Sequence, residues 1–441
     1  MSSSSRQHPE ILEKVPMPET LLDIISIRRI PRPQQQEQGS ASPSPSSDSD
    51  SFLYETTSLP WSFGYGRRAF GGTTLAVCVQ AAYTSLLDKM GPEAAEAYTL
   101  YSFQGSFLSP TKITDTLRIR VTPIRDSRSF VTRVVQGFQY EENGDERNTF
   151  IATADFVRRG QPTVEGGTFS TIPMNPVTKS AWEAPETLMN VMDINALRRR
   201  KYDEGVKSGN IQPDPQVDRA ITLESLLWSP ISKLQEQRPL PTSPVNESIT
   251  AFDVDRRLTQ DGLSVTDKTT ADYLRWSENP AEILQANPEG TKRSGWTLAS
   301  LNACSLSLSL DYYLAGIALF HSKIPRHAAL FVSLDFSLRF HIADIDATQW
   351  HLREAKAITG AQGRTFSEAS VWAQKDGRLV ATISQQCYCR PTQEPTHGGP
   401  AVVTISQSNP TDPNTPAPKE EESVEGDLEK DGSAVGGRAK L

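Results

Sequence analysis

The stretch at residues 72–90, GTTLAVCVQAAYTSLLDKM, predicts one long helix around which a folded domain can form. It opens on glycine and threonine and is followed by Gly91-Pro92, which are common start and stop signals for a helix. Apolar residues recur along it at helical spacing, at Leu75, Cys78, Val79, Ala82 and Leu86. One face of this helix is therefore expected to be buried.

Strand-like segments separated by turn signals follow this helix. We expect strands over residues 99–108, 117–125, 129–140 and 149–157. Between the last two strands the chain reads EENG, which is typical of a hairpin turn. A long helix followed by an antiparallel meander that can wrap it predicts an α+β layer arrangement.

The same order of elements recurs in the second half of the chain. A strand-like segment at 248–254 precedes a helix candidate at 297–321. Further strands are expected at 328–340, 350–358, 365–374 and 379–389. A helix-and-meander unit that occurs twice predicts a tandem repeat. The sequence identity between the halves is weak, so this prediction rests on the order of the elements.

The composition indicates folded domains between disordered ends. Only 37% of the 441 residues are hydrophobic and 31 are proline, which is lean for a chain of this length. Residues 34–51 are polar, low-complexity sequence that cannot bury enough apolar surface to become ordered. We expect a disordered N-terminal tail (1–51), a first helix-and-sheet domain (52–160), a partly structured linker (161–245), a second such domain (246–391) and a disordered acidic tail (392–441).

Charge and cysteine content argue against several classes of function. The net charge of −8 supplies no overall basic field for a nucleic acid. The four cysteines lack the spacing of a disulfide framework or a zinc site, so we expect buried free thiols and no metal. The first residues lack the apolar segment of a secretory signal, and no run of about 18 apolar residues predicts a membrane span.

The last three residues, Ala439-Lys440-Leu441, are a close variant of the Ser-Lys-Leu peroxisomal address. The stretch before them, from about Thr392, is rich in Pro, Glu, Gly and Ser, as expected of an accessible tail. The sequence therefore predicts a peroxisomal matrix protein and a peroxisomal import receptor as a partner.

Asp311 lies where packing alone favours another kind of residue. It shares a stripe of the second helix candidate with apolar side chains, where a carboxylate is costly unless it is paired or hydrogen-bonded. By position alone, an Asp that caps the helix or pairs with a basic neighbour is the better interpretation than a catalytic one. The alternation SLSLSL at residues 305–310 also competes with the helix prediction.

Ser333 and Gln385 lie on expected strands. Ser333 belongs to the polar side of a strictly alternating strand, which fits an exposed edge and, less well, the lining of a cleft. Gln385 shares the register of Ile383 and Cys387, so its amide faces the core and needs hydrogen-bond partners. A structural Gln that bridges strands and a Gln that holds a water molecule are both compatible with that position.

Motifs in both halves together resemble the type II acyl-CoA thioesterases, the TesB-like family of double hot-dog proteins, which has peroxisomal members. The resemblance covers roughly residues 60–160 and 297–390. In the first half it rests on Phe70-Gly71-Gly72, Ser102-Phe103 and Arg125-Asp126, among other positions. In the second half it rests on SLDYYLAGIAL from Ser309, VSLDFSLRFH from Val332 and DGRLVATISQQCYCR from Asp376.

This resemblance implies a tandem hot-dog fold in which each half is a long central helix wrapped by an antiparallel sheet. It implies hydrolysis of fatty acyl-CoA by a water molecule that Asp311, Ser333 and Gln385 hold, with Asp311 as the general base. Acyl-CoA is then the substrate, and neither a metal nor a cofactor is needed. Association into a homo-oligomer stays open.

The sequence departs from the family pattern around the expected pocket. Tyr101 and Gln104 replace two histidines, Ser109 replaces an arginine, and Phe336 replaces a histidine. The shape of the acyl or CoA pocket is therefore expected to differ. The alternative function is an acyl-CoA-binding or acyl-transfer hot-dog protein of a specialised peroxisomal biosynthetic pathway. A serine hydrolase is disfavoured because the chain has no G-x-S-x-G motif.

Overall fold

The computed structural model describes most of the chain between residues 18 and 391. The described residues are 18–31, 51–62, 68–162, 164, 169–215, 217–218, 221–222, 231–250, 258–312, 314–322 and 329–391. All of them lie in one unit, Met1–Val403.

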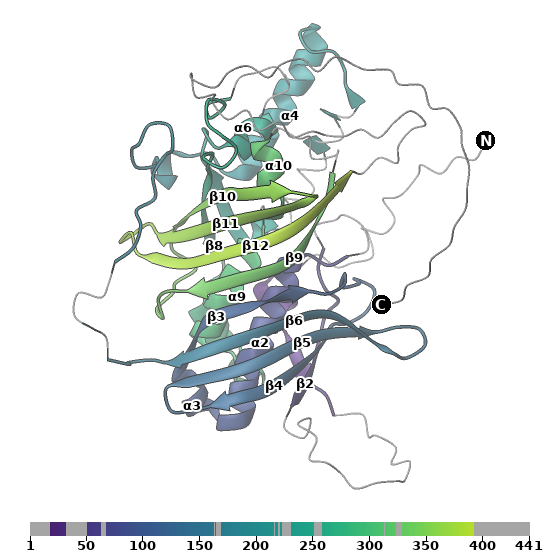
Figure 1. Ribbon diagram of the computed structural model, residues 1–441, viewed down its shortest axis with the longest axis vertical. Helices are drawn as coiled ribbons and strands as arrows, with labels where there is room; N and C mark the ends of the chain where they lie inside the picture. Colours follow the sequence, from purple (N-terminus) through teal and green to yellow (C-terminus); the bar gives the residue numbers. More distant parts are fainter. Residues whose placement is uncertain are drawn as a thin grey trace, which may run out of the picture. The chain divides into compact units, whose positions relative to one another are not determined.

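The described strands form one 12-stranded antiparallel sheet in the order β1-β2-β4-β5-β6-β3-β9-β12-β11-β10-β8-β7 (Figure 1). The strands of the first half are β1 (Ile27–Arg29), β2 (Phe52–Thr56), β3 (Tyr98–Phe107), β4 (Arg118–Asp126), β5 (Phe130–Tyr140) and β6 (Glu146–Arg158). Those of the second half are β7 (Gln235–Pro239), β8 (Thr270–Trp276), β9 (Ala329–Phe340), β10 (His351–Ala361), β11 (Arg364–Ala373) and β12 (Leu379–Pro391). The halves join where β3 pairs with β9, with Gln104 opposite Ser337.

The helices of the first half and the linker are α1 (Leu21–Ile25), α2 (Gly71–Met90), α3 (Pro92–Glu96), the 3₁₀ helix η3 (Pro185–Thr187) and α4 (Val191–Ser208). Those that follow are α6 (Pro244–Thr250), α7 (Pro280–Ala286), α8 (Pro288–Ser294), α9 (Leu298–Leu310), the 3₁₀ helix η4 (Leu314–Gly316) and α10 (Ile317–His321).

Helices α2 and α9 pack side by side behind the sheet in the view of Figure 1. They run antiparallel, because the Cys304 thiol contacts the carbonyl of Ala76 at 3.3 Å while Thr84 bonds the carbonyl of Ser294, just before α9. Most of α2 and nearly all of α9 are buried, so both helices belong to the core. The start of α2 therefore meets the end of α9 inside the protein.

The tandem α+β hot-dog prediction is confirmed, and so are the long first helix and the four strands that follow each of the two central helices. The strand expected at 248–254 was wrong, because α6 occupies Pro244–Thr250, while residues 251–257 lie outside the described part. A proline at the start of a helix suits its first turn, where no backbone N–H is needed. The edge strand of this half is instead β7, inside the expected linker.

Two further expectations need correction. Residues 18–31 belong to the fold rather than to a disordered tail, since α1 has a capping box at Thr20 and β1 pairs with β2. Apolar side chains of this short segment enter the core at Leu21, Ile24, Ile25 and Ile27. The helix expected at 297–321 is interrupted after Leu310, with Asp311 at its C-terminal cap. The expected tail at 392–441 lies outside the described residues.

The segment Leu298–His321 is the one described stretch long and apolar enough to cross a membrane by length and composition. Of its most apolar window, 94% is buried inside the protein. This segment is apolar because it packs against α2 and the sheet in the core.

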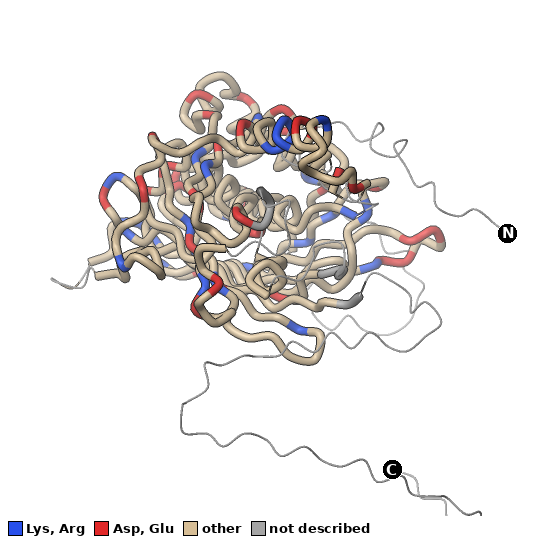
Figure 2. The backbone as a smooth tube through the Cα atoms, turned by 90° about the horizontal axis from the view of Figure 1, so that it is seen from above, with Lys and Arg blue, Asp and Glu red and all other residues tan. Residues whose placement is uncertain are grey.

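Acidic and basic residues are interspersed along the described backbone (Figure 2). Exposed charges of both signs at short spacing largely cancel at a distance. The electrostatics of an interior site are therefore set by the groups that contact it.

Candidate active site

Asp311 brings a carboxyl group into the core at the end of α9. It forms the C-terminal cap of the helix and is 7% exposed. A carboxylate in such a position has little access to water and must find hydrogen-bond donors inside the protein. The groups that surround Asp311 are therefore the first place to look for a polar site in the second half.

Two donors from different halves of the protein reach this carboxyl group. The Gln385 side chain on β12 donates from Nε2 to Oδ1 at 2.8 Å. The backbone N–H of Gly72, in the first turn of α2, donates a second hydrogen bond. Since the first N–H groups of a helix have no partner within the helix and carry partial positive charge, this terminus favours an anion.

The approach of α2 to Asp311 requires glycine. A Cβ atom on Gly71 would lie 2.6 Å from Oδ2 of Asp311, closer than van der Waals contact allows. A Cβ on Gly72 would lie 2.5 Å from the carbonyl oxygen of Leu308. The glycine pair at the start of α2 is thus what lets the two helices meet at the carboxyl group.

Burial raises the pKa of the Asp311 carboxyl to about 6, against the hydrogen bonds from Gln385 and Gly72, which lower it. At neutral pH most of the group is therefore ionised, yet its pKa is close enough to neutral pH for the group to take up a proton readily. This combination suits a general base, which must accept a proton and release it again.

Ser333 lies on the same face of the sheet as Gln385, contrary to the strict alternation predicted for its strand. Asp335 pairs with Gln386, but the next pair is Ser333 with Cys387, so Leu334 is an extra residue in β9. Such a β-bulge shifts the alternation by one position. Ser333 therefore points to the inner side with Cys387, whereas Phe336 still faces Gln385 there.

Cys387 links the Ser333 hydroxyl to the Asp311–Gln385 pair. Its Sγ hydrogen-bonds the Ser333 hydroxyl and lies 3.7 Å from Oε1 of Gln385. Burial raises the pKa of the Cys387 thiol, and the nearby Asp311 charge raises it further. The structure thus gathers all three predicted residues into one cluster, in which Gln385 contacts Asp311 directly and Ser333 connects through Cys387. The thiol was predicted only as a buried cysteine.

An aromatic wall adjoins this cluster. Phe336 lies opposite Gln385 on β9, and its ring stacks on that of Phe150 with centroids 5.6 Å apart. The rings of Phe103 and Phe107 also pack on the Phe336 ring, with centroid distances of 5.4 and 5.8 Å. Phe107 is only partly buried, so the wall extends from the interior cluster toward solvent.

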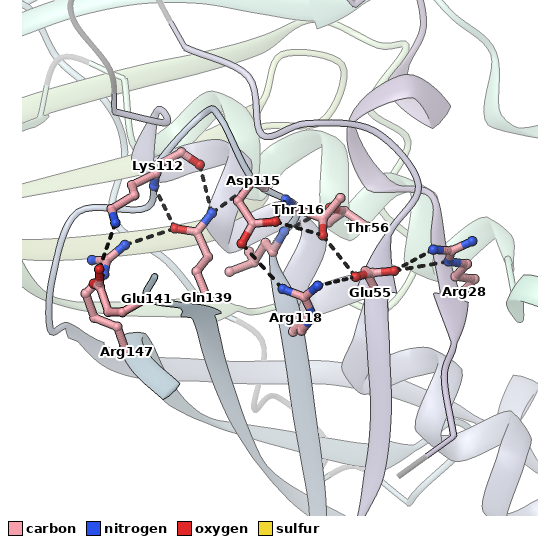
Figure 3. A network of polar contacts seen from close by, with 11 residues as sticks. Arg28, Glu55, Thr56, Lys112, Asp115, Thr116, Arg118, Gln139, Glu141 and Arg147 are labelled. Atoms are coloured by element: carbon pink, nitrogen blue, oxygen red, sulfur yellow. Dashed lines mark hydrogen bonds and ion pairs between the residues drawn. The ribbon is translucent and has the colours of Figure 1, made fainter. Parts of the chain in front are cut away.

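A polar network holds the start of α2 in place. Ala69 donates its N–H to the carbonyl of Thr111 at 2.8 Å, two residues before Gly71. The buried Gln139 amide in turn bonds the N–H and the carbonyl of Lys112, each at 2.8 Å (Figure 3). Ion pairs extend the network at Lys112–Glu141, Arg147–Glu141, Arg118–Glu55 and Arg28–Glu55. This network holds the loop at Thr111-Lys112 in place, and that loop in turn holds the residues just before α2.

The first half has apolar residues at the positions that correspond to Ser333 and Gln385. A matching bulge in β3 follows Leu100, which pairs with Phe156, and Phe103 pairs with Ala154. By this register Leu100 corresponds to Ser333 and Ala154 to Gln385, and both are buried. Within the described residues, no group of three or more His, Cys, Asp or Glu side chains is placed to hold a metal ion.

Two family profiles match the sequence. The acyl-CoA thioesterase N-terminal domain matches residues 58–157, and the acyl-CoA thioesterase C-terminal domain matches residues 234–389. No protein with a curated function matches the sequence significantly.

Solved structures are similar to this chain at low sequence identity. A putative thioesterase II from Thermobifida fusca is 13% identical with a TM-score of 0.50, over 84% of this chain and 97% of that one. The acyl-CoA thioesterase II TesB2 from Mycobacterium marinum is 16% identical with a TM-score of 0.49, over 86% and 99%.

The Gly71→Ala variant tests the contact between α2 and Asp311. Because the new methyl group would overlap the carboxyl group, we expect the variant to fold but to lose at least about tenfold in thioester hydrolysis, as small displacements of catalytic groups do. Gly262→Ala is the matched control, since a Cβ there meets nothing within 4 Å. Equal activity of the two variants would contradict the assigned contact.

Proposed function

Because the chain belongs to the type II acyl-CoA thioesterase family and is a thioester hydrolase, we propose that it splits fatty acyl-CoA with a water molecule activated by Asp311. The observation that carries this proposal is the buried carboxyl group of Asp311, whose pKa is about 6 and which Gln385 and the start of α2 hold in place. The products are the free fatty acid and CoA.

In the proposed reaction Asp311 accepts a proton from water as the water oxygen attacks the thioester carbonyl carbon. The carbon–sulfur bond then breaks, and the proton goes from Asp311 to the departing CoA sulfur. A thioester carbonyl is electrophilic enough that one oriented water and one base suffice. Such proton transfer accelerates reactions by about 10²–10⁴-fold.

Ser333 and Gln385 orient that water. Both lie on the inner face of neighbouring strands, and Gln385 already fixes one oxygen of the Asp311 carboxyl group at 2.8 Å. A hydroxyl and an amide can each donate to or accept from water, so the pair suits a molecule between Ser333 and Asp311. Fixing the attacking oxygen in advance lowers the entropic part of the barrier.

The start of α2 stabilises the negative charge that develops during attack. The Gly72 N–H in its first turn already bonds Asp311 at the end of α9, so this helix start lies beside the carboxyl group. Backbone donors at a helix N-terminus are effective for an oxyanion in a dry site.

The aromatic wall supplies the surface for the acyl chain. Phe336 adjoins Gln385, and the rings of Phe103, Phe107 and Phe150 continue from it. Apolar side chains suit a fatty acyl group, which gains free energy on leaving water.

The test is release of the CoA thiol from acyl-CoA substrates of graded chain length. We expect release by the natural protein and a loss of about 10²–10⁴-fold in Asp311→Asn, which removes the base but keeps the shape. Glu354→Gln is the matched control, because burial also raises the pKa of Glu354, whose carboxyl group bonds the Trp182 indole and the Met174 N–H instead. Binding of acyl-CoA without thiol release at any length would leave a binding or transfer protein.

The pH dependence reports the ionisation of Asp311. A base must be ionised to accept a proton, so activity should be present above the folded pKa and lost as pH falls through about 6. Gln385→Leu removes a hydrogen bond that lowers this pKa, so the acid limb of kcat/KM should move to higher pH. Gln386→Leu serves as the control and should leave the limb in place. A limb near the ordinary carboxyl pKa, about 4, would rule out Asp311 as the group observed.

We further propose that the protein acts in the peroxisomal matrix, imported by a receptor that binds Ala439-Lys440-Leu441. The support is the likeness of these three residues to the Ser-Lys-Leu address. All three lie outside the described part of the chain. An N-terminal fluorescent fusion should co-localise with a peroxisomal marker. Deleting the three residues, or adding one after Leu441, should abolish this. A cytosolic signal from the intact fusion would contradict the proposal.

A further inference from the structure

We propose that Arg353 is a positioning residue for the hydrolysis, because its buried guanidinium group fixes the turn that carries Asp311. This inference rests on the proposed function and adds to it a residue that does not touch the substrate. Arg353 lies on β10 and is 3% exposed, so the group acts entirely within the protein.

The guanidinium group bonds the backbone on both sides of Asp311. Its Nη1 donates to the carbonyl of Ser309 at 2.8 Å and to that of Tyr312 at 3.2 Å. Asp311 stands between these two residues at the end of α9. One planar group therefore holds both flanks of the residue that carries the carboxyl group.

The remaining donors of Arg353 anchor it to the sheet. Nε and Nη2 bond the two carboxylate oxygens of Asp272 on β8, at 2.9 and 2.6 Å. Asp272 is also 3% exposed and accepts a bond from the Gln237 amide on β7. Two parallel bonds to a carboxylate fix the orientation of a guanidinium, and a lysine ammonium cannot reproduce this fork.

The hydrogen bonds from Arg353 to the two carbonyls reduce a repulsion at the end of α9. The last carbonyls of a helix have no partner in the helix and carry partial negative charge, which repels a carboxylate at the same end. Arg353 binds two carbonyls of this turn, while Gly72 and Gln385 bind the carboxyl group itself. The negative charge of Asp272 offsets the positive charge of Arg353. Arg353 therefore acts mainly by fixing the position of this turn.

Other bonds keep this end of α9 on the sheet independently of Arg353. The Ser309 hydroxyl donates to Oε1 of Gln235 at 2.6 Å, and the Trp276 indole donates to the carbonyl of Ser305 at 3.1 Å. A variant at Arg353 therefore keeps its helix in the core and loses the orientation of the last turn.

Arg133 provides a matched control in the first half. It is fully buried, pairs with Asp126 at 2.7 Å and donates to the carbonyl of Thr132 at 3.0 Å. None of these groups belongs to the cluster around Asp311. A general cost of disturbing a buried arginine should thus be equal at the two positions, whereas an effect on the reaction should appear at Arg353 alone.

The experiment compares Arg353→Lys, Arg353→Met and Arg133→Lys in the full chain, at a temperature where circular dichroism shows each to be folded. Relative to the natural protein, we expect kcat to fall about 10–100-fold in Arg353→Lys with KM within about threefold, and further in Arg353→Met. For Arg133→Lys we expect kcat within about twofold, despite a comparable loss in thermal stability. Equal kcat in the natural protein and both Arg353 variants, or an equal loss in Arg133→Lys, would overturn the proposal.

A crystal structure of Arg353→Lys separates this inference from the proposed function. We expect the 2.8 Å contact between Gln385 Nε2 and Asp311 Oδ1 to be lost or lengthened. That result does not depend on turnover, so it decides the role of Arg353 even if the natural protein hydrolyses no substrate offered. An unchanged contact would overturn the positioning role.

Discussion

The meeting of the start of α2 with the end of α9 is the constraint on which the rest of the structure depends. The Asp311 carboxyl group is buried there, and it is held by a backbone N–H from the first half and an amide from the second. Glycine at position 71 leaves room for it, and the loop braced by Gln139 fixes where α2 begins. The continuous sheet, joined through β3 and β9, keeps the two helices in this relation. The two halves therefore form one site jointly.

The halves share their architecture and differ in chemistry. Both carry a bulge at the corresponding place, in β3 after Leu100 and in β9 after Ser333. In the second half the bulge turns the Ser333 hydroxyl to the inner face, where it bonds Cys387, while in the first half the same position holds leucine. Ala154 likewise fills the place of Gln385. Both halves thus provide the same strand framework, but only the second half has the polar residues of the cluster at these positions.

Local pattern was enough to predict much of this fold, whereas the choice of Asp311, Ser333 and Gln385 as site residues came from the family resemblance. Asp311 and Gln385 stood out because each is a polar residue within an apolar register, and the structure places them in contact. Ser333 was assigned to the opposite face, because a bulge depends on the pairing of β9 with β12 and leaves no mark in one strand. The helix end at Asp311 was missed because Leu308, Ala315 and Ala318 continue the apolar stripe across it. Arg353 was missed because the partners of its guanidinium group, Asp272 on β8 and the carbonyls at the end of α9, lie far from it in sequence and are brought together only by the fold.

The most direct measurement is a crystal structure with a ketone analogue of acyl-CoA, in which a methylene group replaces the thioester sulfur and the carbonyl remains. We predict a water molecule bonded to Asp311 and to Ser333 or Gln385, with its oxygen about 3–3.5 Å from the carbonyl carbon. We also predict the carbonyl oxygen near the start of α2 and the acyl chain along Phe336. A carbonyl bound elsewhere, with no water between it and Asp311, would contradict water activation by Asp311.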